Sequence, residues 1–203
     1  MIAEAISFLR EQLNAHFGTF RELPTDLPVV MRALVDQRGE VTPGGEQGVS
    51  LTLVNVEEEI AARKPYAQRE TETGFEIGPA ALNLNLSVLV SAEFRPSNGP
   101  TDPEGVSKNY GRTLQSLTRA VHFFHSRPSF SPEDSPDLPK GIEKLIVRQV
   151  NLSIQEQQNL WAYLGAKYAP SVLYKISMLS LPADYRSRIA APLHDFRLNF
   201  RSR

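Results

Sequence analysis

The sequence contains no cysteine, and this absence excludes three kinds of chemistry at once. Without a thiol there can be no disulfide bridge, no thiolate ligand for a metal ion and no cysteine nucleophile. The absence also removes the usual clue to an oxidising or reducing compartment.

Long hydrophobic runs are also missing. No apolar stretch reaches the roughly 20 residues that a membrane-spanning helix needs. The first residues, MIAEAISFLREQL, include an acid at Glu4 and no small-residue cleavage site, so they do not resemble a secretory signal. We therefore expect a soluble chain without a membrane span, made in the cytoplasm of the producing cell.

Neither sign of charge dominates, because the formal net charge is −1 and the isoelectric point is near 6.4. The chain as a whole has no attraction for nucleic acid or for an anionic membrane, so any such binding would be local. The phosphate-binding loops, the hydrolase nucleophile elbow and the zinc-protease helix lack their motifs. The sequence predicts no catalytic residue, no cofactor and no metal site, although a Ser-His-Asp triad assembled only in space stays possible.

Two groups of polar residues invite a metal interpretation that their geometry disfavours. His122 and His125 lie three residues apart on a predicted helix, but cysteine is absent and no nearby motif supplies further ligands. The three acids at 57–59 close a predicted strand, where neighbouring side chains point to opposite faces and cannot converge on a cation. We interpret the acids as a solvated strand end.

Hydrophobic periodicity predicts a single α+β domain, with a mixed or mostly antiparallel sheet, about three helices and long loops. Helices are expected at 2–17, 110–126 and 153–164, and strands at 49–56, 82–94, 142–152 and 171–181, with a short apolar run at 29–35 before a polar turn. The stripe of Ile2, Ile6, Leu9, Leu13 and Phe17 is typical of core packing, with a partner contact as the alternative. The segments 61–79, 95–109 and 128–139 read as loops, the first of them as a mobile loop or an arm.

The third helix has the clearest end signals. Ser153 and Glu156 have the spacing of a capping box, and Ile154, Leu160, Trp161 and Leu164 form an incomplete apolar face. Gly165 stands where a left-handed residue ends a helix, and Pro170 prevents its continuation. Strand, helix and strand thus follow one another between 141 and 181.

Several stretches together resemble one protein family. They are, in order, IAEAISFLREQLNAHF, VSLTLVNVEEE, ALNLNLSVLVSAEF, SLTRAVHFFHSRPSF, LPKGIEKLIVRQVNLS and VNLSIQEQQNLWAYLGAKYAPSVLYKISMLSL. Their order is similar to that in the cap, or tail-terminator, proteins of extracellular contractile injection systems, the phage-tail-like particles of the antifeeding-prophage type. The resemblance covers about residues 1–181.

The resemblance implies a structural protein, not an enzyme. Copies are expected to form a ring, a hexamer in this family, on the distal end of the inner tube and sheath, where it stops polymerisation and anchors the sheath. The expected partners are the sheath protein, the inner tube protein and further copies of the chain, assembled into the particle. Two alternatives stay open: an adaptor elsewhere in the same particle, and a small enzyme with no recognisable motif.

We divide the chain into a terminator domain at 1–181 and a tail at 182–203. The tail alternates apolar and polar residues, which suits either an arm that adds to a partner's sheet or a closing edge strand. Aromatic and arginine side chains dominate interface energetics. The predicted interface residues are therefore Trp161, Tyr163, Tyr168, Phe196, Arg197, Leu198 and Phe200, with core packing as the stronger alternative for Trp161.

Overall fold

The computed structural model describes residues 1–19, 29–36, 38–40, 47–59, 66–71, 74–79, 82–94, 103–180 and 188–190. In these residues the elements follow the order α1 (Ile2–Gly18), β1 (Val29–Met31), β2 (Gln47–Glu58), β3 (Tyr66–Thr71), β4 (Gly74–Pro79), β5 (Leu82–Phe94), α2 (Pro103–Ser126), β6 (Ser129–Phe130), β7 (Ile142–Val150), α3 (Ile154–Leu164), β8 (Ser171–Ser180) and β9 (Arg188–Ala190). The predicted α+β class is confirmed. None of these helices has both the length and the apolar character required to cross a membrane.

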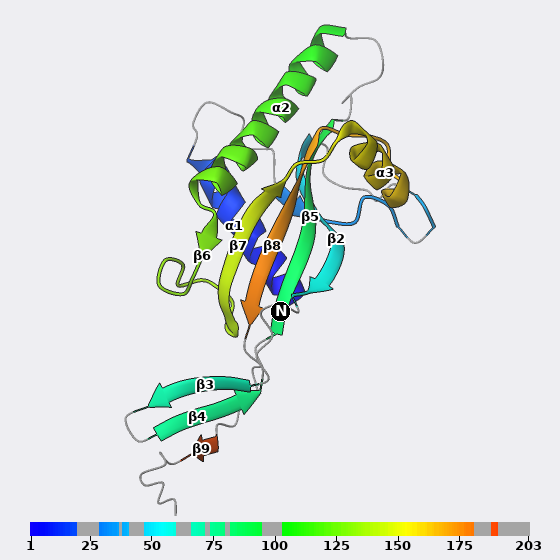
Figure 1. Ribbon diagram of the computed structural model, residues 1–203. Coiled ribbons are helices and arrows are strands. Elements are labelled where there is room, and N and C mark those ends of the chain that lie inside the picture. The colour runs from blue at the N-terminus through cyan, green and yellow to red at the C-terminus, as the bar shows by residue number, and fades with distance from the viewer. Residues whose placement is uncertain are drawn as a thin grey trace, which may run out of the picture.

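A six-stranded sheet in the order β1-β2-β5-β8-β7-β6 forms the centre of the fold (Figure 1). The short β1 runs parallel to β2, and every other neighbouring pair is antiparallel. The sheet is therefore mixed and mostly antiparallel, as the alternating sequence patterns predict. The prediction for residues 82–94 matches β5, which pairs with β2 on one side and β8 on the other.

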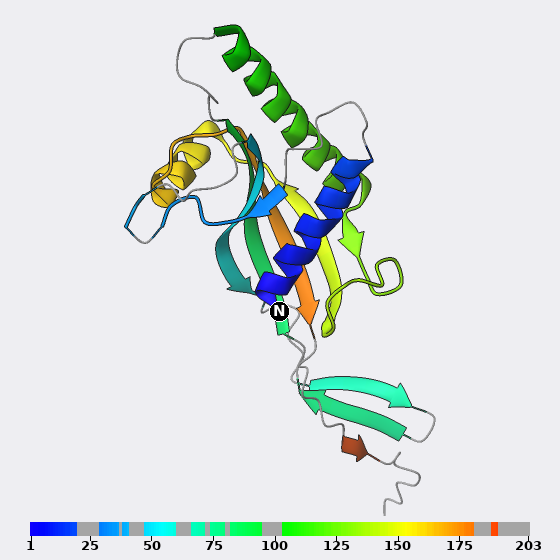
Figure 2. The ribbon, with the colours of Figure 1, turned by 180° about the vertical axis from the view of Figure 1, so that it is seen from behind.

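Helices α1 and α2 cover one face of this sheet (Figure 2). The main core lies between them and the strands, and it includes Leu9 and Leu13 of α1, which are fully buried. Its aromatic side chains contact one another, with the Phe8 and Phe130 rings 5.4 Å apart in an edge-to-face arrangement. The predicted core role of the 2–17 stripe is confirmed, since Ile6, Leu9 and Leu13 are buried and Ile2 and Phe17 pack against the same core.

A guanidinium group fastens the loop after β6 to the first helix. Arg127 donates hydrogen bonds to the Gln12 side chain at 3.1 Å and to Ser135 Oγ at 2.8 Å. Its charged carbon lies 4.9 Å from the centre of the Phe130 ring, within cation–π range. These contacts join α1, β6 and the loop after β6 to the residue that follows α2.

The opposite face of the sheet carries a smaller cluster beneath α3. Trp161, Leu34 and Leu89 are its buried members, and Leu160, Leu164 and Leu173 pack against it. Leu89 and Leu173 alternate with residues of the main core, as expected of strands buried on both faces. This second cluster covers only one end of the sheet (Figure 1).

Three predicted loops contain regular structure, which corrects the sequence analysis. The segment 61–79 includes the hairpin of β3 and β4, the segment 95–109 includes the first residues of α2, and the segment 128–139 includes β6. Pro103 is the first residue of α2, a position that proline favours and that the prediction overlooked. In the N-terminal region, the short apolar run at 29–35 contains the strand β1, which ends at Met31.

A separate three-stranded sheet joins distant parts of the chain. Its order is β3-β4-β9, with both pairs antiparallel. Both ribbon views show it beyond the end of the six-stranded sheet where β5 begins and β8 ends (Figures 1 and 2). The hairpin inserted between β2 and β5 thus meets residues 188–190 from the predicted tail.

Candidate interaction surfaces

The predicted capping signals of α3 are confirmed. The Glu156 amide donates a hydrogen bond to Ser153 Oγ, and the Ser153 amide donates one to the Glu156 carboxylate at 2.8 Å. Hydrogen bonds that the Ser153 amide and the Ser153 hydroxyl donate to the Glu156 carboxylate hold the pKa of Glu156 below its ordinary value. Gly165 has a φ of +64°, a left-handed conformation that glycine adopts at low cost, and it ends the helix.

The predicted aromatic anchors near α3 differ in exposure. Tyr163 is 79% exposed and Tyr168 is 64% exposed, whereas Trp161 is only 5% exposed. The indole of Trp161 packs against Leu34 and Leu89, with its ring centre 5.8 Å from that of Tyr168. Trp161 therefore packs in the core of this chain, and the two tyrosines offer accessible rings.

The remaining predicted interface residues are Phe196, Arg197, Leu198 and Phe200, and all four lie outside the described residues. The described part of the tail is β9, which forms an edge strand beside β4. The domain boundary predicted at 181 stays a prediction.

The exposure of Ile154 differs from the apolar face that the sequence predicts for α3. This side chain lies seven residues before Trp161 and therefore on the same face of α3, yet it is 87% exposed. The apolar face predicted for this helix is thus covered at Trp161 and open at the first turn. An isoleucine directly after a capping serine is the only local signal, and it does not reveal which turn the sheet covers.

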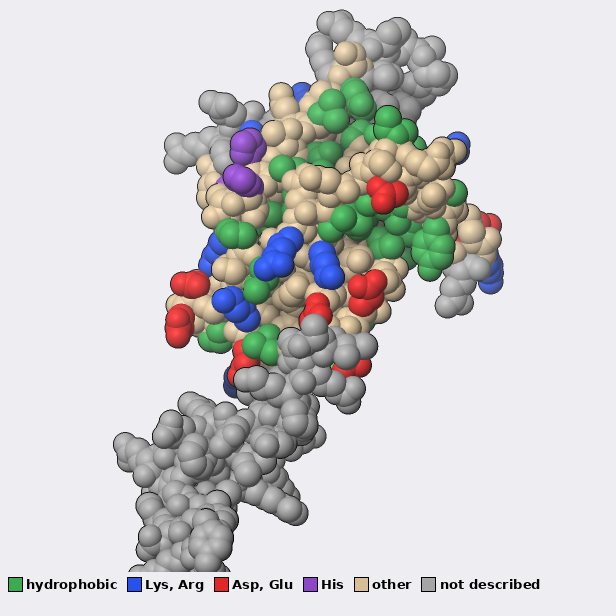
Figure 3. Space-filling model, viewed as in Figure 1, with side chains coloured by type: hydrophobic (Ala, Val, Ile, Leu, Met, Phe, Trp, Pro, Cys, Tyr) green, Lys and Arg blue, Asp and Glu red, His purple; other side chains and the backbone are tan. Residues whose placement is uncertain are grey.

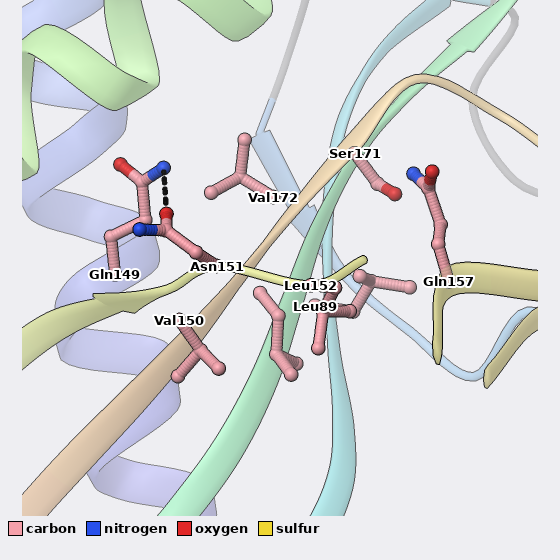
Figure 4. Close-up of a pocket in the computed structure, with 9 residues that line it drawn as sticks. Leu89, Gln149, Val150, Asn151, Leu152, Gln157, Ser171 and Val172 are labelled. Atoms are coloured by element: carbon pink, nitrogen blue, oxygen red, sulfur yellow. Dashed lines mark hydrogen bonds between the residues drawn. The ribbon is translucent and has the colours of Figure 1, made fainter. Parts of the chain in front are cut away.

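A small pocket lies between the end of β7, the start of β8 and α3 (Figure 4). Its volume is about 200 Å³, and its lining residues are Leu89, Gln149, Val150, Asn151, Leu152, Gln157, Ser171, Val172 and Leu173. The Gln149 and Asn151 side chains are joined by a 3.4 Å hydrogen bond. The lining contains amides, a hydroxyl and apolar groups but no acid or base, so the pocket has no group suited to acid–base catalysis.

Histidine and carboxylate positions do not converge on a metal in the described part of the chain, where no group of three or more such residues is placed to hold an ion. His16 lies against the Phe123 ring, with 5.1 Å between the ring centres. Burial, and then the positive charge of Arg119, lower the pKa of His16. The imidazole is therefore biased toward its neutral form.

Basic side chains gather on the sheet face that α1 and α2 leave uncovered (Figure 3). Arg148 of β7 lies directly opposite Lys175 of β8, and Lys144 precedes Arg148 by four residues on the same strand. Lys144 and Arg148 are exposed, and Lys175 is half-buried. On the same face, Glu57 of β2 lies toward the other edge of the sheet, because it pairs with Asn85, which pairs with Ser177.

At the β2 side of the sheet, another strand pairs with β2 along only part of its described length. The Asn14 side chain closes the outer edge of β1, accepting a 2.9 Å hydrogen bond from the Val29 amide and donating one to the Val29 carbonyl. β1 pairs with β2 only from Val49 to Leu51. Beyond that point Leu53 and Val56 of β2 are 38% and 40% exposed.

The comparisons with known proteins agree with the resemblance in the sequence. A family model described as the Pvc16 N-terminal domain matches residues 4–193, which extends past the end that we predicted for the resemblance. No curated protein matches the chain. The family match confirms the predicted resemblance to the cap, or tail-terminator, proteins.

Two solved structures have a similar fold. One is the sheath/tube terminator of PVC, an extracellular contractile injection system, in its extended state; its TM-score is 0.61 at 13% identity, and the match covers 100% of this chain. The other is the anti-feeding prophage cap, a tube-terminating cap, with a TM-score of 0.56 at 11% identity and 98% of this chain covered. This chain spans 64% and 60% of those two proteins, less than two thirds of either.

Proposed function

Because the chain belongs to the Pvc16 N-terminal domain family, we propose that it is a structural terminator of a contractile injection system. In this role it caps the distal end of the inner tube and sheath and acts by binding, without turnover. The observation that carries the proposal is the likeness in fold along the whole chain to the PVC sheath/tube terminator.

A closed ring is the simplest device that can end such a polymer. A growing tube presents the same heterologous surface after every layer, and a ring that binds this surface without regenerating it stops growth. The chain would then contact the inner tube protein, the sheath protein and its own copies, with six copies expected in the ring. It would be made in the cytoplasm of the producing cell and assembled into the particle there.

The exposed features of the molecule suit this role. Tyr163 and Tyr168 present accessible rings of the kind that anchor protein interfaces. The sheet of β3, β4 and β9 stands beyond the main sheet, where it can reach a neighbouring subunit (Figure 1). We propose that this small sheet, with Phe196, Arg197, Leu198 and Phe200 after it, is the arm that contacts sheath or neighbour.

Particle length tests the proposal directly. Negative-stain electron microscopy would compare particles from the producing cell with and without the gene. We expect overlong or variable tubes, with sheath absent or detached, when the gene is deleted. Particles of normal length that contract normally would reject the terminator role. Gold labelling that places the chain at the baseplate end would instead support the adaptor alternative.

Truncation separates the tail from the domain. We expect deletion of residues 182–203 to leave a folded, soluble domain and to abolish capping. Normal particle length with the truncated chain would exclude a role for the tail in capping. Insoluble protein would instead support the closing-strand interpretation of the tail, in which β9 completes the small sheet.

A further inference from the structure

Two like charges face each other on the uncovered side of the sheet. Arg148 and Lys175 are directly opposite across the β7–β8 ladder, an arrangement that destabilises an antiparallel pair. In the part of the chain that the structure describes, no carboxylate forms an ion pair with Arg148 or Lys175. The repulsion between Arg148 and Lys175 lowers the stability of the chain, and no contact within the described chain offsets it. This indicates an anionic partner outside the chain.

The β2 edge offers the matching charge. Glu57 and Glu58 are exposed at the end of β2, and Glu57 lies on the same sheet face as Arg148. Since β1 ends at Met31, no described strand flanks residues 53–58 on their outer side. Such an edge presents backbone groups that can pair with a strand from another chain. The Leu53 and Val56 side chains are exposed along this edge.

The strand directions make the two edges of the sheet compatible. Adjacent strands alternate in direction through β2, β5, β8 and β7, so β2 and β7 run opposite ways. A neighbouring copy turned about an axis along the strands would therefore place its β2 antiparallel to β7. On that far edge β6 pairs with Leu145 and Ile146, and the Val147 amide donates a 2.8 Å hydrogen bond to the Pro128 carbonyl, so residues 148–150 extend past the covered part.

We propose that β2 of one copy adds to β7 of the next, with Glu57 opposite Arg148. In this register Val56 lies opposite Gln149, and Asn55 lies opposite Val150. Directly opposed residues in a ladder share a face, which agrees with Glu57 and Arg148 both lying on the uncovered face. The contact is heterologous, so repetition can close a ring. The inference rests on the proposed terminator ring and adds the surface that builds it.

Introduced cysteines test the register. The chain has no cysteine of its own, so any disulfide must come from the introduced ones. A Val56→Cys protein is mixed with a Gln149→Cys protein and oxidised with glutathione disulfide. We expect disulfide-linked pairs that contain one of each, since paired strands place Cα atoms within the range of a disulfide. A chain that carries both Val56→Cys and Gln149→Cys should form disulfide-linked dimers, trimers and larger oligomers. Gln158→Cys, on the exposed side of α3, is the control and should not link to Val56→Cys.

Charge reversal tests the ion pair. Arg148→Glu and Glu57→Lys should each weaken association by about tenfold at every subunit contact, because each sets like charges together. The doubly reversed chain should regain most of the loss, as measured by sedimentation velocity. Lys140→Glu and Glu40→Lys change the same charges at exposed positions elsewhere and should leave association unchanged.

Crosslinking in purified particles separates this inference from the proposed function. The Val56–Gln149 disulfide in particles that contain the chain would support both. If the chain is present but this disulfide does not form, the edge-to-edge contact is wrong and the terminator role stands. If Val56→Cys links mainly to itself, the contact is a two-fold one and the inference is overturned. Absence of the chain from particles would overturn the proposed function itself.

Discussion

The two faces of the six-stranded sheet contrast in what they bury. On one face α1 and α2 enclose a continuous core of aliphatic and aromatic side chains, among them the fully buried Phe130 and Leu145. On the other face the described residues form a small cluster around α3 and Leu34, and beyond it this face carries charged and amide side chains together with the half-buried Ile146. The chain therefore draws most of its stability from one face and leaves the other available to partners.

Adjacent residues of β7 give the sharpest test of this contrast. Leu145 is fully buried in the main core, so Leu145→Ala should lower the free energy of unfolding by about 3 kcal/mol. Ile146 is half-buried on the opposite face, and Ile146→Ala should cost about 1 kcal/mol. Urea denaturation of both variants measures the difference. Equal losses would show that the two faces contribute alike.

A buried phenol extends the comparison to alkaline pH. Tyr174 is 3% exposed beside Phe124, and burial raises its pKa to about 12. Between about pH 10 and pH 12 the unfolded chain loses this proton and the folded chain keeps it, so stability falls as pH rises. The loss approaches about 2–3 kcal/mol above pH 12.

The Tyr174→Phe variant isolates this contribution. Its stability should fall less steeply than that of the parent chain between about pH 10 and pH 12. At neutral pH it should be as stable as the parent or more so, because the Tyr174 hydroxyl is buried without a hydrogen-bond partner in the described structure. Denaturant titrations at several pH values measure both effects. Parallel pH profiles for the two proteins would contradict the burial argument.

The cap of α3 tests the weaker face. Ser153→Ala removes the hydroxyl that accepts from the Glu156 amide and should cost about 1 kcal/mol. Because α3 packs on the small cluster of described residues and not on the main core, hydrogen exchange should accelerate in α3 and leave α1 and α2 protected. Ser153→Asp keeps a capping acceptor and is the control. Uniform acceleration across all three helices would indicate that the two faces unfold together.

Local patterns in the sequence predicted local structure well. The alternation from Leu82 to Phe94 gives β5, and the Ser153–Glu156 spacing gives the start of α3. The β3–β4 hairpin was missed because its residues show little apolar alternation and several turn formers. The position of Arg148 opposite Lys175 could not be predicted from the sequence, because it depends on the register between two separate strands.

The smallest expected effect separates stability from assembly most clearly. Lys175→Glu replaces a like-charge pair by an opposite-charge pair across β7 and β8, which should raise the stability of the isolated chain by about 0.5 kcal/mol. The new carboxylate at position 175 would also pair with Arg148 of the same chain. Arg148 would then bind Glu57 of a neighbouring copy less well, so association should weaken. Lys175→Gln is the control, and it should give about half of the stability gain.

Thermal denaturation and sedimentation velocity on the same samples measure the two effects of Lys175→Glu. A gain in both stability and association would mean that Arg148 does not meet a neighbour's carboxylate. A loss in both would mean that Lys175 is needed within the chain itself, so that the uncovered face is not set aside for partners. If the uncovered face serves assembly, Lys175→Glu should raise stability and weaken association. The repulsion between Arg148 and Lys175 is then offset only when a neighbouring copy binds.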